Sequence, residues 1–186
     1  MLPDRYAVVD VETTGLRPVA DRIVEVACVL VDGDCVVDRW STLIRPGIDI
    51  PARATEVHGI TNEMVADAPE LRAVLGELRG RCQARIVVAH YARFDLSFLR
   101  ELHVEAAICT LKLARALVPE APNHRNQTLR SFLRIDEAMG EKLGAHRALD
   151  DALVTAHVLI ACHRRFVQRR PAVSWERFLR ERAAVA

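Results

Sequence analysis

Two acidic side chains stand at the end of an apolar stretch near the start of the sequence. Asp10 and Glu12 lie at the end of the run Tyr6–Val11, which is predicted to be a buried strand. Residues two apart on a strand point to the same face, so these two carboxylates would lie side by side. Repulsion between their charges and the loss of their hydration would both cost free energy. A divalent cation between them would remove both costs. The alternative is that the strand ends here and both groups are solvated.

A third acidic residue follows the short apolar run Ile86–Ala89, where a predicted strand passes into a predicted helix. Asp95 begins that helix, Asp95–Leu102, and could cap it. Phe94 and Leu99 would then pack together around the cap as a hydrophobic staple. A carboxylate at a helix start is also held well for a metal ion, so the two roles are compatible.

The stretch from His146 to Asp151 combines a histidine with a further carboxylate. Gly144 predicts that His146 lies on a loop and that the helix Ala148–Phe166 begins after it. Asp151 falls in a row of small and apolar residues on this helix and should point inward. Asp150 is then an ordinary first-turn acid favoured by the helix dipole. A solvated loop histidine is the alternative for His146.

Four carboxylates and one histidine can together perform metal-dependent hydrolysis. Oxygen ligands alone favour hard cations such as Mg²⁺ or Mn²⁺ over zinc. Two such ions about 3.5–4 Å apart are a known arrangement for in-line cleavage of a phosphodiester. A histidine with a pKa near ~6.5 can take the proton of the attacking water. The predicted catalytic residues are Asp10, Glu12, Asp95, Asp151 and His146.

Five predicted strands position these residues. Ile23–Val31 and Val36–Ile44 flank Asp32-Gly33-Asp34, and an Asp-Gly pair between apolar runs is a strong hairpin signal. The other strands are Tyr6–Val11, Ile86–Ala89 and Ala106–Cys109. Further helices are predicted over Leu71–Cys82, Thr110–Val118, Thr128–Leu133 and Ser174–Arg182, with a loop from Pro46 to Thr61. This order predicts an α/β fold with a mixed five-stranded sheet flanked by helices.

Composition bounds the class of protein. The chain has 186 residues, of which 51% are hydrophobic, and this suits one domain. It has no apolar run near the ~20 residues of a membrane span and no signal-peptide pattern, so we expect a cytoplasmic protein without membrane contact. The five cysteines form no C-x-x-C pair and are expected to be free thiols, with Cys28, Cys109 and Cys162 buried.

Charge alone does not identify a partner. The net charge is +1, but residues 163–182 hold seven arginines against Glu176 and Glu181. This segment could contact phosphates or could be a solvated basic helix. If metal ions neutralise four carboxylates, the rest of the chain carries about +5, which suits a phosphate chain.

The acidic stretches resemble the motifs of the DEDDh family of 3′→5′ exonucleases. This family includes the epsilon proofreading subunit of bacterial DNA polymerase III and many stand-alone exonucleases. The resemblance covers about Tyr6 to Arg165. The matching stretches are Asp10-x-Glu12-Thr13-Thr14-Gly15, His90-x-x-x-Phe94-Asp95, His146-Arg147-Ala148-x-x-Asp151-Ala152 and the further element His58-Gly59-Ile60-Thr61.

The resemblance implies a ribonuclease H-like fold with two Mg²⁺ or Mn²⁺ ions and His146 as the general base. The implied metal ligands are Asp10, Glu12, Asp95 and Asp151. The implied contacts to the terminal nucleotide are Thr13, Thr14, Gly15, Leu16, His58 and Phe94. For His58 and Phe94 the alternatives are a loop residue and core packing. Tyr91 departs from the family, which usually has Asn there, and it could stack on a base or serve only in packing.

The function predicted from the sequence is metal-dependent 3′→5′ exonuclease activity on single-stranded DNA, which would release nucleoside 5′-monophosphates in repair or proofreading. The alternatives are an exoribonuclease acting on RNA ends and a non-catalytic adaptor that binds a polymerase. DNA is favoured over RNA, association with a polymerase is possible, and the oligomeric state is open. We expect an exonuclease domain over residues 1–170 and a C-terminal helical extension over residues 171–186.

Overall fold

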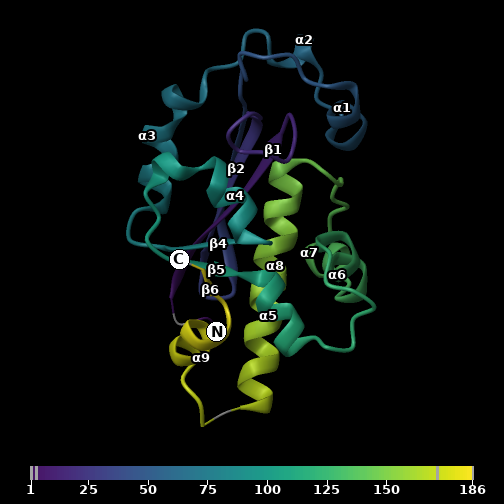
Figure 1. Ribbon diagram of the computed structural model, residues 1–186. Helices are drawn as coiled ribbons and strands as arrows, with labels where there is room; N and C mark the ends of the chain where they lie inside the picture. Colours follow the sequence, from purple (N-terminus) through teal and green to yellow (C-terminus); the bar gives the residue numbers. More distant parts are fainter. Residues whose placement is uncertain (1, 3, 171, 186) are drawn as a thin grey trace.

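The computed structural model describes residues 2, 4–170 and 172–185, and these form a mixed six-stranded sheet covered by helices (Figure 1). The strands lie in the order β3-β2-β1-β4-β5-β6. Strands β1 to β3 form an antiparallel meander, β4 and β5 run parallel to β1, and β6 is antiparallel to β5. In chain order they span Arg5–Thr13, Ile23–Asp32, Cys35–Leu43, Ile86–Ala89, Ala107–Cys109 and Ala184–Val185.

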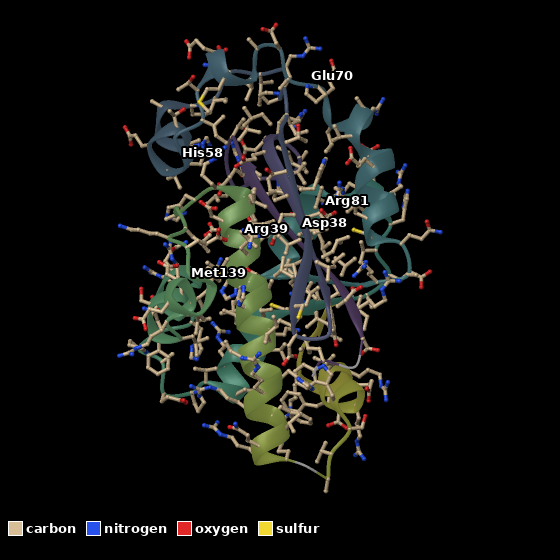
Figure 2. All side chains as sticks on the ribbon, turned by 180° about the vertical axis from the view of Figure 1, so that it is seen from behind. Asp38, Arg39, His58, Glu70, Arg81 and Met139 are labelled. Atoms are coloured by element: carbon tan, nitrogen blue, oxygen red, sulfur yellow. The ribbon has the colours of Figure 1, made fainter. Side chains whose placement is uncertain are left out.

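Helices cover both faces of the sheet. The long helix α8 (Ala148–Arg169) lies across β1 and β2, while α3 (Leu71–Cys82) and α4 (Ala92–Phe98) pack against the sheet in a second core. The other helices are α1 Ala52–His58, α2 Asn62–Val65, α5 Thr110–Leu117, α6 Asn126–Phe132, α7 Ile135–Met139, α9 Trp175–Arg182 and the 3₁₀ helix η1 Arg100–Leu102. An ion pair between Arg81 and Asp38 ties α3 to β3 (Figure 2).

Strand β1 divides the core in two through the alternation of its side chains. Tyr6 and Val8 pack in the cluster that contains α8, whereas Ala7 and Val9 pack in the cluster that contains α3. All four side chains are buried, because helices cover the strand on both faces. Continuing the alternation beyond Val9 places the next even-numbered residues on the α8 side.

The chain end adds a sixth strand to the five that were predicted. Strand β6 is two residues long, too short to show an alternating pattern in the sequence, and its place is set by pairing with β5. The preceding helix α9 packs on the body, since Trp175 and Phe178 are buried and the indole of Trp175 donates to the Tyr6 hydroxyl (3.1 Å). Residues 171 and 186 of the predicted extension lie outside the described residues, and its boundary stays a prediction.

Two local expectations differ from the structure. The stretch from Pro46 to Thr61 contains helix α1, which ends at Gly59 in a left-handed conformation, rather than a continuous loop. Asp95 does not cap α4, because that helix already begins at Ala92. Tyr91 has a left-handed backbone (φ 59°) that turns the chain sharply after β4, so the helix starts earlier and Asp95 lies inside its first turns.

Most arginines near the chain end bind acids or carbonyls of the chain itself. Arg164 pairs with Asp34 (3.2 Å), and Arg177 pairs with Glu181 (2.8 Å). Glu120 accepts from Arg165, and the Leu117 carbonyl accepts from Arg169 (3.0 Å). These contacts favour the solvated basic helix over a segment built to bind phosphates.

The predictions from cysteine usage agree with the structure. All five cysteines are free, and Cys28, Cys109 and Cys162 are buried. In the part of the chain that the structure describes, none of the helices combines the length and apolar character that crossing a membrane requires.

Candidate active site

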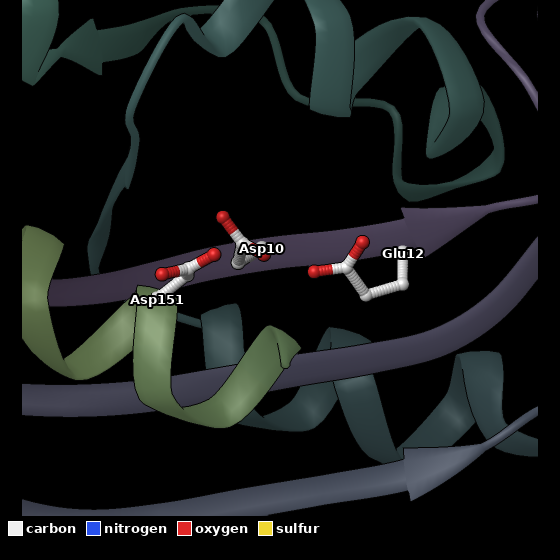
Figure 3. Close-up of side chains that lie close together, drawn as sticks. All are labelled: Asp10, Glu12 and Asp151. Atoms are coloured by element: carbon white, nitrogen blue, oxygen red, sulfur yellow. The ribbon is translucent and has the colours of Figure 1, made fainter. Parts of the chain in front are cut away.

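Three carboxylates meet where the end of β1 faces the start of α8. Asp10, Glu12 and Asp151 each offer an oxygen, and these oxygens lie within 4.8 Å of one another (Figure 3). Asp10 and Glu12 share the α8 side of β1 with Tyr6 and Val8 because strand residues alternate between faces. Asp151 enters from the first turn of α8, so the group joins residues that are distant in the sequence.

Asp95 approaches the same place from α4 but is not a member of the three-carboxylate group. Its side chain is only 3% exposed, and its negative charge raises the pKa of Asp10. Burial raises the pKa of Asp95 itself to about 8, and backbone hydrogen bonds from Asp95 and Val11 oppose that change. Asp95 therefore adds a fourth acidic group behind the cluster.

The acidic groups make each other costly to ionise. Burial, followed by the charges of Asp95 and Asp151, raises the pKa of Asp10 well above its usual range. Burial and the neighbouring charges of Asp151 and Glu25 raise the pKa of Glu12 to about 8, and Arg147 offsets this only in part. A divalent cation would favour the ionised form of every carboxylate here. The all-oxygen donor set fits a hard cation, so the cluster can bind a divalent metal ion.

His146 lies in the loop directly before α8 and is exposed. Its backbone is left-handed (φ 55°), which is uncommon outside glycine and turns the chain just before the helix. Burial raises the pKa of Asp151, and the charge of His146 is the largest opposing influence. His146 thus lies near Asp151.

The connection after β1 is stabilised by its own hydrogen bonds. The Thr13 hydroxyl donates to the Gly15 carbonyl (2.6 Å), and the buried Thr14 hydroxyl accepts from the Arg22 backbone (3.0 Å). A side chain on Gly15 would approach the Asp21 carboxylate to 2.6 Å, so Asp21 would have to move to make room for it. Leu16 follows and is 80% exposed, which leaves an apolar side chain in solvent next to the acidic cluster.

The other predicted substrate contacts lie on two helices. His58, on α1, is buried near the beginning of α8 (Figure 2). Its Nδ1 accepts from the Ile60 backbone (3.0 Å), and its buried Nε2 has no hydrogen-bond partner in the described chain. Phe94 is half-buried on α4 and packs against Phe98, with ring centroids 5.1 Å apart. Tyr91 is exposed at the start of the same helix.

An ion pair that was not predicted, between buried Glu25 and partly exposed Arg147, fastens the beginning of α8 to β2. Glu25 is 3% exposed, and in the antiparallel register of β1 and β2 it lies opposite Glu12. Its carboxylate accepts from Arg147 at 3.0 and 2.7 Å and from the Ala148 backbone at 2.9 Å. Glu25 thus satisfies a free N–H at the helix start, as a capping side chain would. A lone acid inside the apolar run Ile23–Val31 was the available signal.

Two amide side chains on α6 contact Asp151, and they were also not predicted. Gln127 donates to Oδ1 of Asp151 (2.5 Å), and Asn126 donates to its backbone carbonyl (3.0 Å). Both residues lie just before the helix that was predicted over Thr128–Leu133, and no local pattern marks them as partners of a residue on α8. They fix the orientation of the Asp151 carboxylate.

Comparison with known proteins identifies the family. A family model described as exonuclease matches residues 7–159, which include all five predicted catalytic residues. The chain belongs to the exonuclease family. Membership of its DEDDh type, predicted from the motifs, agrees with this match and with the relatives of the chain.

The exonuclease chain has relatives among bacterial DNA polymerase III proteins. It is 38% identical over 174 residues to the PolC-type DNA polymerase III of Oceanobacillus iheyensis, covering 89% of this chain but only 12% of that protein. It is 33% identical over 169 residues to the DNA polymerase III epsilon subunit of Aquifex aeolicus, covering 86% of this chain and 81% of that one. The chain thus spans about an eighth of its PolC-type relatives.

Solved structures show the same fold. Exonuclease X, in complex with 5′ overhanging duplex DNA, superposes with a TM-score of 0.77 at 34% identity, covering 94% of this chain and 98% of that chain. An exonuclease I structure superposes with a TM-score of 0.70 at 20% identity, covering 90% of this chain and 42% of that one, and shows the fold alone. The exonuclease chain therefore has the predicted ribonuclease H-like α/β architecture, with six strands rather than five.

Proposed function

We propose that the chain is a metal-dependent 3′→5′ exonuclease that hydrolyses phosphodiester bonds at the 3′ end of single-stranded DNA and releases nucleoside 5′-monophosphates. The observation that carries the proposal is the meeting of Asp10, Glu12 and Asp151 within 4.8 Å in a chain of the exonuclease family. The pKa values of Asp10 and Glu12 are raised by burial and by the negative charge that this site concentrates. Such a site is suited to cations and, through them, to phosphates.

Each acidic residue has a part in the proposed reaction. Asp10, Glu12, Asp95 and Asp151 would hold two Mg²⁺ or Mn²⁺ ions. When bound, such ions supply an activated water and stabilise the charge that develops on the leaving oxygen. His146 takes the proton of the attacking water, and its exposed position before α8 allows it to pass that proton to solvent.

The groups around the cluster would hold the terminal nucleotide. We propose that the turn Thr13–Leu16 contacts the nucleotide, with the exposed Leu16 side chain against its apolar faces. The buried, unpaired Nε2 of His58 can bond a polar atom of the nucleotide, which would remove the cost of leaving it unsatisfied. Phe94 has a half-exposed ring for the same pocket.

DNA is proposed as the substrate, in repair or proofreading, with a polymerase as a possible partner. The support comes from relatives named as DNA polymerase III proteins and from the similar exonuclease X structure with DNA. A solved 3′-exonuclease that recognises a histone mRNA stem-loop is only 16% identical, so its similarity supports the fold and not an RNA substrate.

The test is a cleavage assay with 5′-labelled single-stranded DNA and RNA in Mg²⁺, Mn²⁺ or EDTA. We expect a ladder that shortens from the 3′ end, faster on DNA, and that disappears in EDTA and in Asp10→Ala. Asp67→Ala, which removes an exposed acid outside the cluster, is the control and should cleave normally. Absence of cleavage of either polymer with either metal would refute the proposed activity.

A further inference from the structure

We infer that Arg130, on α6, is a positioning residue that holds the His146 loop and the Asp151 carboxylate in one fixed arrangement. The inference deepens the proposed function and rests on it for the roles of His146 and Asp151. Arg130 lies outside the four stretches that match the family motifs and contacts neither carboxylate of β1. Its side chain is nevertheless only 11% exposed.

All five N–H donors of the Arg130 guanidinium have acceptors. Nε and one Nη2 hydrogen bind the two oxygens of Asp136, at 2.7 and 2.8 Å, as a bidentate pair. The second Nη2 hydrogen donates to the Leu143 carbonyl, and Nη1 donates to the Gly144 carbonyl and to Oε1 of Gln127 (3.2 Å). A guanidinium offers five donors in a rigid plane, so this site uses its full capacity.

The contacts with Leu143 and Gly144 fix the loop that leads to His146. Gly144 is held from the other side as well, because its backbone N–H donates to the Asp150 carboxylate (2.7 Å). A side chain at Gly144 would come within 2.6 Å of that carboxylate, so a larger residue here would displace Asp150. Leu143 and Gly144 lie three and two positions before His146. Arg130 therefore limits where the imidazole can be.

The contact with Gln127 carries the same constraint to Asp151. Because Arg130 binds Oε1 of Gln127, the amide must turn its Nε2 toward Asp151, where it donates to Oδ1 (2.5 Å). One side chain thus sets both the loop before His146 and the rotation of the Asp151 carboxylate. Rates respond strongly to such geometry, since a misplacement of about 1 Å can lower them about 100-fold.

Arg134 provides a contrast and a matched control. It lies between α6 and α7, is 77% exposed at the side chain, and pairs with Glu137 at 3.6 Å. Exposed pairs of this kind contribute little to stability. Arg134→Lys should therefore leave both the loop and the reaction as they are in the unchanged chain.

The experiment compares Arg130→Lys with Arg134→Lys. Lysine keeps the charge but offers three donors from a single atom, too few for five acceptors. We expect kcat on single-stranded DNA to fall about 10- to 100-fold, with KM changed less than about threefold. Amide hydrogen exchange of residues 143–147 should become faster, while exchange in β1 and β2 stays unchanged. Added guanidinium ion should restore part of the activity of Arg130→Ala.

If Arg130→Lys fails to fold, Gln127→Met separates the effect of Arg130 on Asp151 from its effect on the loop before His146. It removes only the link to Asp151, so kcat should fall while exchange of residues 143–147 stays slow. The inference is wrong if kcat and loop exchange in Arg130→Lys match those of Arg134→Lys, or if kcat in Gln127→Met is unchanged. If the unchanged chain cleaves no nucleic acid, the proposed function is wrong. The positioning role of Arg130 is then still tested by hydrogen exchange, and it is refuted if exchange of residues 143–147 is the same in Arg130→Lys as in the unchanged chain.

Discussion

Neutralising Glu12 should make the metal-free protein more stable while it weakens metal binding. Burial and the charges of Asp151 and Glu25 raise the pKa of Glu12 from 4.5 to about 8. At 1.36 kcal/mol for each pKa unit, this change corresponds to about 5 kcal/mol against the ionised form in the folded chain. Relaxation of the fold and entry of water reduce the cost, so we expect Glu12→Gln to gain about 2–3 kcal/mol at pH 8 in EDTA.

The assay is urea unfolding at pH 8, in EDTA and in Mg²⁺, for the unchanged chain, Glu12→Gln and the control Glu105→Gln. Glu105 is exposed, and its neutralisation should leave stability unchanged. Mg²⁺ should stabilise the unchanged chain and stabilise Glu12→Gln much less, because one ligand charge is gone. If Glu12→Gln in EDTA is no more stable than the unchanged chain, then ionised Glu12 does not destabilise the metal-free protein and the reasoning is wrong.

Three further results are expected. In EDTA the unchanged chain should lose stability as pH rises from about 4.5 to about 8, because the raised pKa of Glu12 lets the folded state hold a proton that the unfolded state has released. Urea unfolding midpoints across this pH range measure the loss, and Mg²⁺ should make the midpoint depend less on pH. His146→Ala should lower kcat about 10²- to 10⁴-fold, while Mg²⁺ still raises the unfolding midpoint, since the acidic ligands remain. In Mg²⁺, where the bound cation offsets the repulsion between Glu25 and Glu12, Glu25→Gln should cost about 2 kcal/mol in unfolding free energy by weakening the bonds to Arg147, whereas Glu70→Gln, in an exposed pair, should cost little.

The motifs allowed the acidic site to be located before the fold was seen, because each depends on local geometry. The pair Asp10 and Glu12 required only the two-residue repeat of a strand, and the inward direction of Asp151 required only the helical row it shares with apolar neighbours. The start of α8 after His146 was readable from Gly144 and the apolar run behind it. Family resemblance then supplied the roles.

The prediction that Asp95 caps α4 was wrong. A carboxylate before an apolar run is a sound capping signal, but Tyr91 adopts a left-handed backbone that starts α4 earlier. The strand β6 was missed because two residues have no periodicity, and it exists only because β5 has a free edge to pair with. The missed strand depends on a contact between two segments, whereas the early start of α4 depends on the backbone conformation of Tyr91.

Residue types and spacing are enough to predict the acidic groups, the faces on which they lie and the family whose motifs they match. The side chains that hold these groups in place became known from the packing of distant segments. Glu25 meets Arg147 across 122 positions, and Gln127 reaches Asp151 across 24. The periodicity of a segment specifies which face is buried but not which distant segment covers that face. The supporting residues therefore became visible only when β2, α6 and α8 were packed together.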